Sequence, residues 1–208
     1  MNTVIIFEKR QNIYMDTFTE EQWEERLDAI ESIALKNIKN GKKKYYLFLD
    51  FDGVINIWCR EETDPLFKVR SIKEDDCQFA DIPSIKRLSD LCLKYDINIV
   101  ISSSWRFAGV GYCQRYLKKC GLKKGVKVVG VTAQDFEERQ KHITDYLFEH
   151  PDFTGYMILD DLYLPYLNKN QIKCETLEGF NEQKCHQAHM MLRQMEVRRC
   201  ALKCKKYA

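Results

Sequence analysis

A short apolar run that ends in two closely spaced aspartates constrains the fold of this chain more than any other feature. Residues Tyr45–Leu49 are apolar without interruption, and Asp50, Asp52 and Gly53 follow directly. A short run rich in aromatic and aliphatic side chains is typical of a strand that is buried on both faces of a sheet. Helices must then cover both faces, so the run indicates an α/β fold.

Further apolar runs alternate with helical patterns along the chain. The runs that predict additional strands are 98–101, 126–129, 156–159 and a short piece near Ile172. Apolar residues at helical spacing separate them, near 85–95, 111–120 and 143–147. Strands that alternate with helices at these lengths predict an open, mostly parallel, Rossmann-like sheet in a three-layer arrangement.

Polar residues follow the ends of several of the predicted strands. In an open parallel sheet the carboxyl ends of the strands meet at one edge, and ligands bind there. We therefore expect one crevice to contain the side chains of Asp50, Asp52, Ser102, Asp160 and Asp161.

Both flanks of the predicted sheet region carry helical signals. Thr19 and Gln22 fit a capping box at the start of one helix, and Asn181 is placed to cap a long helix that runs to about Arg199. The predicted organisation is a helical extension at 1–41, a core at 42–180, and a C-terminal helix with a basic tail at 181–208.

Composition excludes several classes of protein. The net charge is only +2, which does not indicate a globally basic nucleic-acid binder. No apolar run approaches the roughly 20 residues that cross a bilayer, so we expect no membrane partner. The nine cysteines are odd in number and scattered, and the start of the chain does not resemble a secretory signal. We interpret the cysteines as reduced thiols in a cytoplasmic protein.

The predicted crevice gathers four carboxylates, which cannot all stay ionised at close range without a cation. Carboxylate oxygens without nitrogen or sulfur ligands suit Mg²⁺. A carboxylate nucleophile, a hard metal ion and a hydroxyl group are the parts that phosphoryl transfer needs. The residues therefore favour a Mg²⁺-dependent reaction of a phosphorylated substrate.

Three segments resemble motifs of the haloacid dehalogenase superfamily. Asp50-Phe51-Asp52-Gly53-Val54 resembles its first motif, residues 99–102 its second, and residues 158–161 its fourth. The likeness is greatest to the phosphatase domain of Swiss-army-knife RNA repair proteins. The segments that carry it are 102–106, 129–132, 156–161 and 179–181. The resemblance implies chemistry similar to that of polynucleotide 3′-phosphatases.

The resemblance also implies a role for each motif residue. Asp50 would attack phosphorus and form an aspartyl-phosphate, and Asp52 would act as the general acid and base. Ser102 would bind the phosphoryl oxygens. Asp160 would be a direct ligand of Mg²⁺ together with Asp50 and the backbone carbonyl of Asp52, with Asp161 close behind.

The cation of the third motif has two candidates. The family needs a Lys or Arg that steadies the nucleophile and the phosphoryl group. The subfamily pattern maps onto residues 139–143 and selects Arg139, but His142 stands where the pattern has Glu. Lys141 therefore remains an alternative.

Other features admit more than one interpretation. Cys185 and His189 share a helix face, but no second pair at zinc-ligand spacing is evident. Trp105 fits core packing or stacking on a base. The basic residues of 193–208 and of 42–44 fit contacts to a phosphate backbone, a solvated helix end, or pairing with the acidic segment 19–31.

We predict a phosphatase with little or no cap, since only about 60–81 is left for one. An open site admits a bulky substrate such as a polynucleotide end. The alternatives are a phosphatase of nucleotides or other small metabolites, and an inactive module of this fold that binds nucleic acid or protein.

Overall fold

The computed structural model describes residues 18–57, 79–135 and 138–204. Within them, one sheet of five parallel strands has the order β3-β2-β1-β4-β5. The strands are β1 (Tyr45–Leu49), β2 (Ile97–Ile101), β3 (Lys127–Val131), β4 (Gly155–Asp160) and β5 (Gln171–Lys173). The predicted parallel α/β fold is therefore confirmed.

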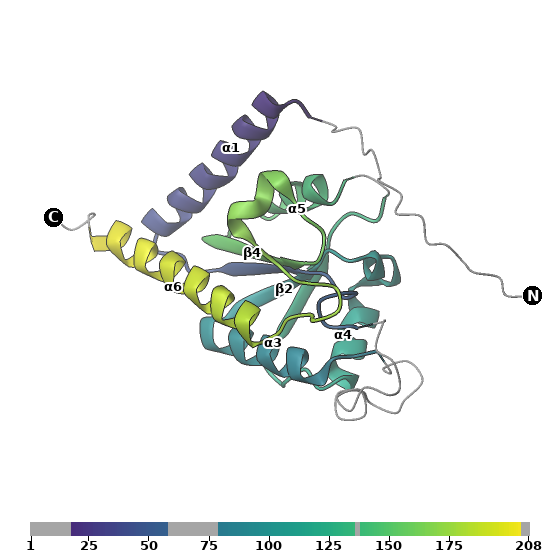
Figure 1. Ribbon diagram of the computed structural model, residues 1–208. Helices are drawn as coiled ribbons and strands as arrows, with labels where there is room; N and C mark the ends of the chain where they lie inside the picture. Colours follow the sequence, from purple (N-terminus) through teal and green to yellow (C-terminus); the bar gives the residue numbers. More distant parts are fainter. Residues whose placement is uncertain (1–17, 58–78, 136–137, 205–208) are drawn as a thin grey trace, which may run out of the picture.

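Helices cover both faces of this sheet, which gives three layers (Figure 1). The helices packed on one face are α3 (Ile82–Tyr95), α4 (Gly109–Lys119) and α6 (Glu182–Cys204). The other face is covered by α1 (Glu20–Lys39) and α5 (Arg139–Glu149). Two short 3₁₀ helices, η1 (Ser104–Ala108) and η2 (Pro165–Asn170), lie in the connections.

Strand β1 shows why the sheet needs both layers. All five of its residues are buried, and successive side chains point to opposite faces. Tyr45, Leu47 and Leu49 join the core under α3 and α6, whereas Tyr46 and Phe48 join the core under α5 and α1. An apolar run without polar interruption is the sequence pattern that such two-sided burial requires.

The predicted helix caps agree with the structure. Thr19 and Gln22 form the capping box of α1, and Asn181 Oδ1 accepts a hydrogen bond from the backbone N–H of Lys184 at the start of α6. Helix α6 continues to Cys204, beyond the predicted end near Arg199. The predicted cap at 60–81 lies outside the described residues except for its last three. No described helix is both long and apolar enough to span a membrane.

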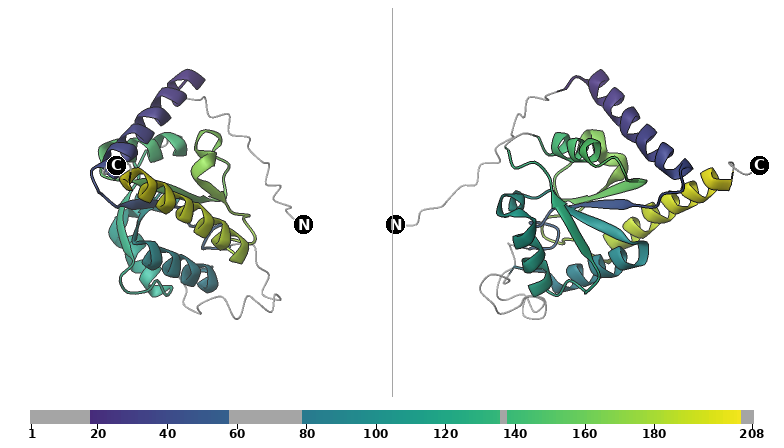
Figure 2. Two further views of the ribbon diagram at one scale, coloured as in Figure 1. Left: turned by 90° about the vertical axis from the view of Figure 1, so that its left-hand side faces the viewer. Right: turned by 180° about the vertical axis from the view of Figure 1, so that it is seen from behind.

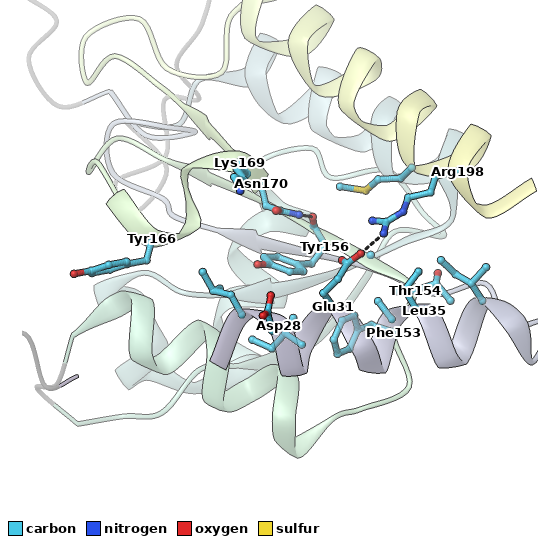
Figure 3. A pocket seen from close by; sticks show the side chains of 16 residues that line it. Asp28, Glu31, Leu35, Phe153, Thr154, Tyr156, Tyr166, Lys169, Asn170 and Arg198 are labelled. Carbon is cyan, nitrogen blue, oxygen red and sulfur yellow. Dashed lines mark hydrogen bonds and ion pairs between the residues drawn. The ribbon is translucent and has the colours of Figure 1, made fainter. Parts of the chain in front are cut away.

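Helix α1 lies across the sheet and leaves a space beneath it. A cavity of about 370 Å³ is lined by residues of α1, η2 and α6 and by residues at the start of β4 (Figure 3). Ile30, Ala34, Phe153 and Tyr156 are among its lining residues. The views in Figure 2 show α1 and the C-terminal end of α6 meeting at one corner of the molecule. Helix α1 adds side chains to one of the two cores and α6 adds side chains to the other. The division of the chain into three parts stays a prediction.

Candidate active site

The register of the sheet brings the predicted site residues to one edge. Leu49, at the end of β1, pairs with Ile101 of β2 and with Leu159 of β4. The residues that follow the strands continue this alignment, because Asp50 N donates to Leu159 O at 2.9 Å and Ser102 N donates to Leu49 O at 3.0 Å. Asp50, Ser102 and Asp160 therefore lie at the same level of the sheet.

Three carboxylates converge at this edge. One oxygen each from Asp50, Asp160 and Asp161 lies within 4.8 Å of the others, and Asp50 and Asp160 are buried. The Asp50 carboxylate is held by the backbone N–H of Phe51, which donates to Oδ1 at 2.8 Å. Side chains more than 100 positions apart in the sequence thus form one cluster.

Arg139 binds two of these carboxylates. As the first residue of α5, it places Nη1 2.8 Å from Asp50 Oδ2 and 2.6 Å from Asp160 Oδ2. Burial alone would lower the pKa of Arg139, but the charges of Asp50 and Asp160 outweigh it and hold that pKa above its ordinary value. Lys141, the alternative cation, pairs instead with Asp145 at 2.9 Å. The structure therefore places Arg139 rather than Lys141 beside Asp50.

The cluster carries more negative charge than Arg139 balances. Burial, opposed by Arg139 and aided by the charge of Asp50, raises the pKa of Asp160 to about 7. Burial also raises the pKa of Asp161, although the hydroxyl of Thr176 donates to its Oδ2 at 2.7 Å and opposes the rise. Buried carboxylate oxygens with excess negative charge are suitable ligands for a hard divalent cation such as Mg²⁺.

Gly53 sits against this cluster. Its φ of +78° lies in the left-handed region, and a Cβ at this position would lie 2.3 Å from Asp161 Oδ2. Glycine is therefore required twice, by the backbone turn after β1 and by the approach of the Asp161 carboxylate.

Ser102 is buried at the same edge. Its hydroxyl oxygen has no hydrogen-bond partner among the residues that the structure describes. Buried hydroxyl groups are normally hydrogen-bonded, so this one is free to bind an oxygen of a ligand.

The side chain of Asp52 does not belong to the carboxylate cluster and binds other residues. It accepts hydrogen bonds from Trp105 Nε1 at 3.0 Å and from Asn56 Nδ2 at 3.3 Å. Any contribution of Asp52 to a metal site would come from its backbone carbonyl, as the family resemblance implies. Sequence reasoning assigned Trp105 only to packing or stacking and did not single out Asn56.

Among the described residues, no third metal ligand lies close enough to Cys185 and His189 to complete a zinc site. Across the described ranges, the group of His, Cys, Asp or Glu side chains close enough to share a metal is the Asp50, Asp160 and Asp161 cluster. His189 Nδ1 instead lies 3.4 Å from the hydroxyl of Tyr95.

Lys43, Lys44 and Arg198 form ion pairs away from the carboxylate cluster. Lys43 and Lys44 precede β1, whereas Asp50 follows it, so they occupy the opposite edge of the sheet. Lys43 pairs with Glu196 at 3.2 Å, and Lys44 pairs with Asp152. Arg198 of α6 pairs with Glu31 of α1. The pair of Arg198 with Glu31 joins α6 to the acidic segment 19–31, whereas Lys43 and Lys44 pair with residues outside that segment. Contact of the basic tail with nucleic acid stays a prediction.

Comparison with known families agrees with this geometry. The family model described as "HAD domain in Swiss Army Knife RNA repair proteins" matches residues 46–185, well over half of the chain. No curated protein matches the chain, and no solved structure does. The matched segment begins in β1 and includes Asp50, Asp52, Ser102, Arg139, Asp160 and Asp161.

Proposed function

Because the chain belongs to the haloacid dehalogenase superfamily, in the family of domains found in Swiss-army-knife RNA repair proteins, we propose that it is a Mg²⁺-dependent phosphomonoesterase. The membership itself suggests a phosphatase. The observation that carries the proposal is the arrangement of Asp50, Arg139 and Asp160 around one point at the edge of the sheet.

The reaction uses two side chains in succession. A carboxylate oxygen of Asp50 attacks phosphorus, and the bond from phosphorus to the ester oxygen breaks. Asp52 donates a proton to that oxygen, so the alcohol leaves in neutral form. Asp52 then takes a proton from water, the water oxygen attacks the aspartyl-phosphate, and inorganic phosphate leaves while the Asp50 carboxylate is regenerated.

The remaining site residues stabilise charge on the phosphoryl group. Arg139 holds the Asp50 carboxylate in position and neutralises part of the charge that develops on the phosphoryl oxygens. The Ser102 hydroxyl donates a hydrogen bond to one of these oxygens. The carboxylates of Asp50, Asp160 and Asp161 and the backbone carbonyl of Asp52 would hold Mg²⁺. When bound, the ion supplies positive charge to the phosphoryl oxygens, as in other phosphoryl transfer sites.

Exposed aromatic and apolar side chains near the site support a bulky substrate such as a polynucleotide end. On one side, Phe107 and Tyr112 are exposed close to Trp105 in sequence. On the other, Leu162 and Tyr163 are exposed directly after Asp161. Bases of single-stranded nucleic acid stack on aromatic rings with little sequence preference. A phosphatase of nucleotides or other small metabolites is the alternative that uses the same chemistry.

Phosphate release tests the reaction and its substrate together. The purified chain is assayed with Mg²⁺ on a 3′-phosphorylated oligonucleotide, on free nucleotides and on p-nitrophenyl phosphate. We expect hydrolysis of all three, with the highest kcat/KM for the oligonucleotide. Equal or faster hydrolysis of the free nucleotides would favour the small-substrate alternative.

Two substitutions at aspartates separate chemistry from folding. Asp50→Asn is expected to lower kcat by about 10⁴-fold or more, because it removes the nucleophile. Asp90→Asn is the matched control, since Asp90 lies on the surface of α3 and pairs with Lys123. Full activity of Asp50→Asn would contradict the proposed nucleophile. Absence of activity in the unmodified protein would contradict the phosphatase function and favour the inactive binding module.

A further inference from the structure

Two residues outside the set of expected catalytic side chains bind the carboxylate of Asp52. Trp105 Nε1 donates to Asp52 Oδ2, and Asn56 Nδ2 donates to Asp52 Oδ1. Each carboxylate oxygen therefore accepts a hydrogen bond from a neutral N–H. We propose that Trp105 and Asn56 are positioning residues that aim the carboxyl group of Asp52 at the leaving oxygen. This inference rests on the proposed phosphatase function.

The indole of Trp105 is held in place on several sides. Its ring centroid lies 5.1 Å from that of Phe51 and 4.6 Å from that of Tyr116. Its backbone carbonyl accepts a hydrogen bond from the thiol of Cys113 at 3.4 Å, and its backbone N–H donates to Ser103 Oγ at 3.4 Å. The indole N–H therefore reaches Asp52 from a fixed direction.

The amide of Asn56 is oriented by a second hydrogen bond. The hydroxyl of Tyr116 donates to Asn56 Oδ1 at 2.6 Å, and Asn56 is fully buried. Because the amide oxygen accepts this bond, the amide nitrogen faces Asp52. Backbone bonds from Gly53 N to Asn56 O and from Asn56 N to Phe51 O, both 2.8 Å, fix the same turn. Tyr116 thus acts on Asp52 through Asn56.

Neither of these donors can take the proton of Asp52. An indole N–H and an amide NH₂ group donate but cannot accept a proton, so neither Trp105 nor Asn56 competes for it. A carboxylate oxygen that accepts one hydrogen bond has a second lone pair that can take a proton. A general acid works only when held within hydrogen-bond reach of its target, and the bonds from Trp105 and Asn56 fix the direction of the Asp52 carboxyl group.

The basicity of the leaving group provides a specific test. An alkyl alkoxide leaves slowly without a proton, whereas p-nitrophenolate leaves readily as the anion. We therefore compare kcat/KM for p-nitrophenyl phosphate and for β-glycerophosphate. General acid catalysis is worth about 10²–10⁴-fold, so Trp105→Phe should raise the ratio of aryl to alkyl hydrolysis by about tenfold or more.

Two further variants guard the experiment against loss of folding. Tyr116→Phe removes only the hydroxyl that orients Asn56, and it should change the ratio in the same direction by a smaller factor. Trp23→Phe is the matched control. Trp23 is fully buried and stacks on Tyr166, but its indole nitrogen has no hydrogen-bond partner within the described part of the chain. The ratio of aryl to alkyl hydrolysis in Trp23→Phe should equal that of the unmodified protein.

A double substitution links the effect to Asp52. Asp52→Asn alone should raise the ratio at least as much as Trp105→Phe, and adding Trp105→Phe to it should raise the ratio no further. Equal slowing of both esters in Trp105→Phe and Tyr116→Phe, or additive effects in the double variant, would overturn the inference. Absence of hydrolysis in the unmodified protein, or retained activity in Asp50→Asn, would instead overturn the phosphatase function.

Discussion

The carboxylate cluster at one edge of the sheet and the cavity under α1 hold their charged side chains in opposite ways. In the cluster, the side chains of Asp50 and Asp160 are 6% and 0% exposed and share one guanidinium group. At the cavity, the side chains of Arg198 and Glu31 are 52% and 45% exposed, and their ion pair lies above apolar lining residues (Figure 3).

The difference shows where charge decides stability and where packing does. Buried charges interact strongly and become costly as soon as a partner is lost. An ion pair in contact with water is screened and contributes about 0–1 kcal/mol. We therefore expect charge substitutions to matter most at the cluster and packing substitutions to matter most at the cavity.

The largest effect is expected from Arg139→Met. In the absence of Mg²⁺, this change leaves Asp50 and Asp160 facing each other without their shared cation, and breaking a buried pair costs about 3–5 kcal/mol. Urea unfolding in EDTA should show this loss, and added Mg²⁺ should recover more stability than it does in the unmodified protein. Lys141→Met on the same helix should cost less, about 1 kcal/mol, because the side chains of its pair with Asp145 are 23% and 30% exposed and water screens them. Equal costs for the two variants would show that the burial of Asp50 and Asp160 does not set the cost of losing their cation.

Gly53→Ala is expected to come next. The added Cβ meets Asp161 Oδ2 at 2.3 Å and also suffers from the positive φ, and strain of this kind costs about 1–3 kcal/mol. Displacement of Asp161 should raise the Mg²⁺ concentration needed for half-maximal phosphatase activity.

The matched control for this substitution is Gly41→Ala. Gly41 has a φ of +80° and nothing within 4 Å of the added Cβ, so it adds similar backbone strain without the clash. An unchanged Mg²⁺ requirement in Gly53→Ala would show that the added Cβ does not displace Asp161 from the metal site.

A smaller and favourable effect is expected at the cavity. Ala34 lines the cavity and is buried, so Ala34→Leu should fill part of the 370 Å³ and stabilise the protein by about 0.5–1 kcal/mol in urea unfolding. Ala188→Leu, in the close-packed core under α6, should instead destabilise by about 1–3 kcal/mol. Destabilisation by both changes would mean that the space under α1 cannot accept a larger side chain.

The smallest effect is expected from Arg198→Ala. Its ion pair with Glu31 is exposed, so the free energy of unfolding should fall by about 1 kcal/mol or less, and by less still in 1 M salt. A loss of several kcal/mol that persists in high salt would contradict the distinction between the two regions.

Features that depend on local chemistry were predictable from the sequence. The apolar run of β1 must be buried on both faces, and the caps of α1 and α6 follow from the hydrogen bonds of Thr19 and Asn181. The parallel sheet then placed the carboxylates at one edge without further information. Family resemblance supplied Arg139, which no periodicity would have distinguished from Lys141.

Features that depend on partial burial or on side-chain direction were not predictable. Strand β3 runs over Lys127–Val131 rather than 126–129, because its exposed and buried residues alternate at the edge of the sheet and the apolar run understates its length. The contact of Trp105 with Asp52 joins residues 53 positions apart through the orientation of one indole. A tryptophan after a run of serines carries no sequence signal for that direction.

The central place of β1 in the sheet has a consequence for folding during synthesis. Its neighbours β2 and β4 both come later in the chain, with β4 ending only at Asp160. A nascent chain therefore holds the predicted nucleophile on a strand with one open edge until residues 155–160 have left the ribosome. Pairing between segments so distant in sequence forms slowly, so the reaction centre is assembled late in translation.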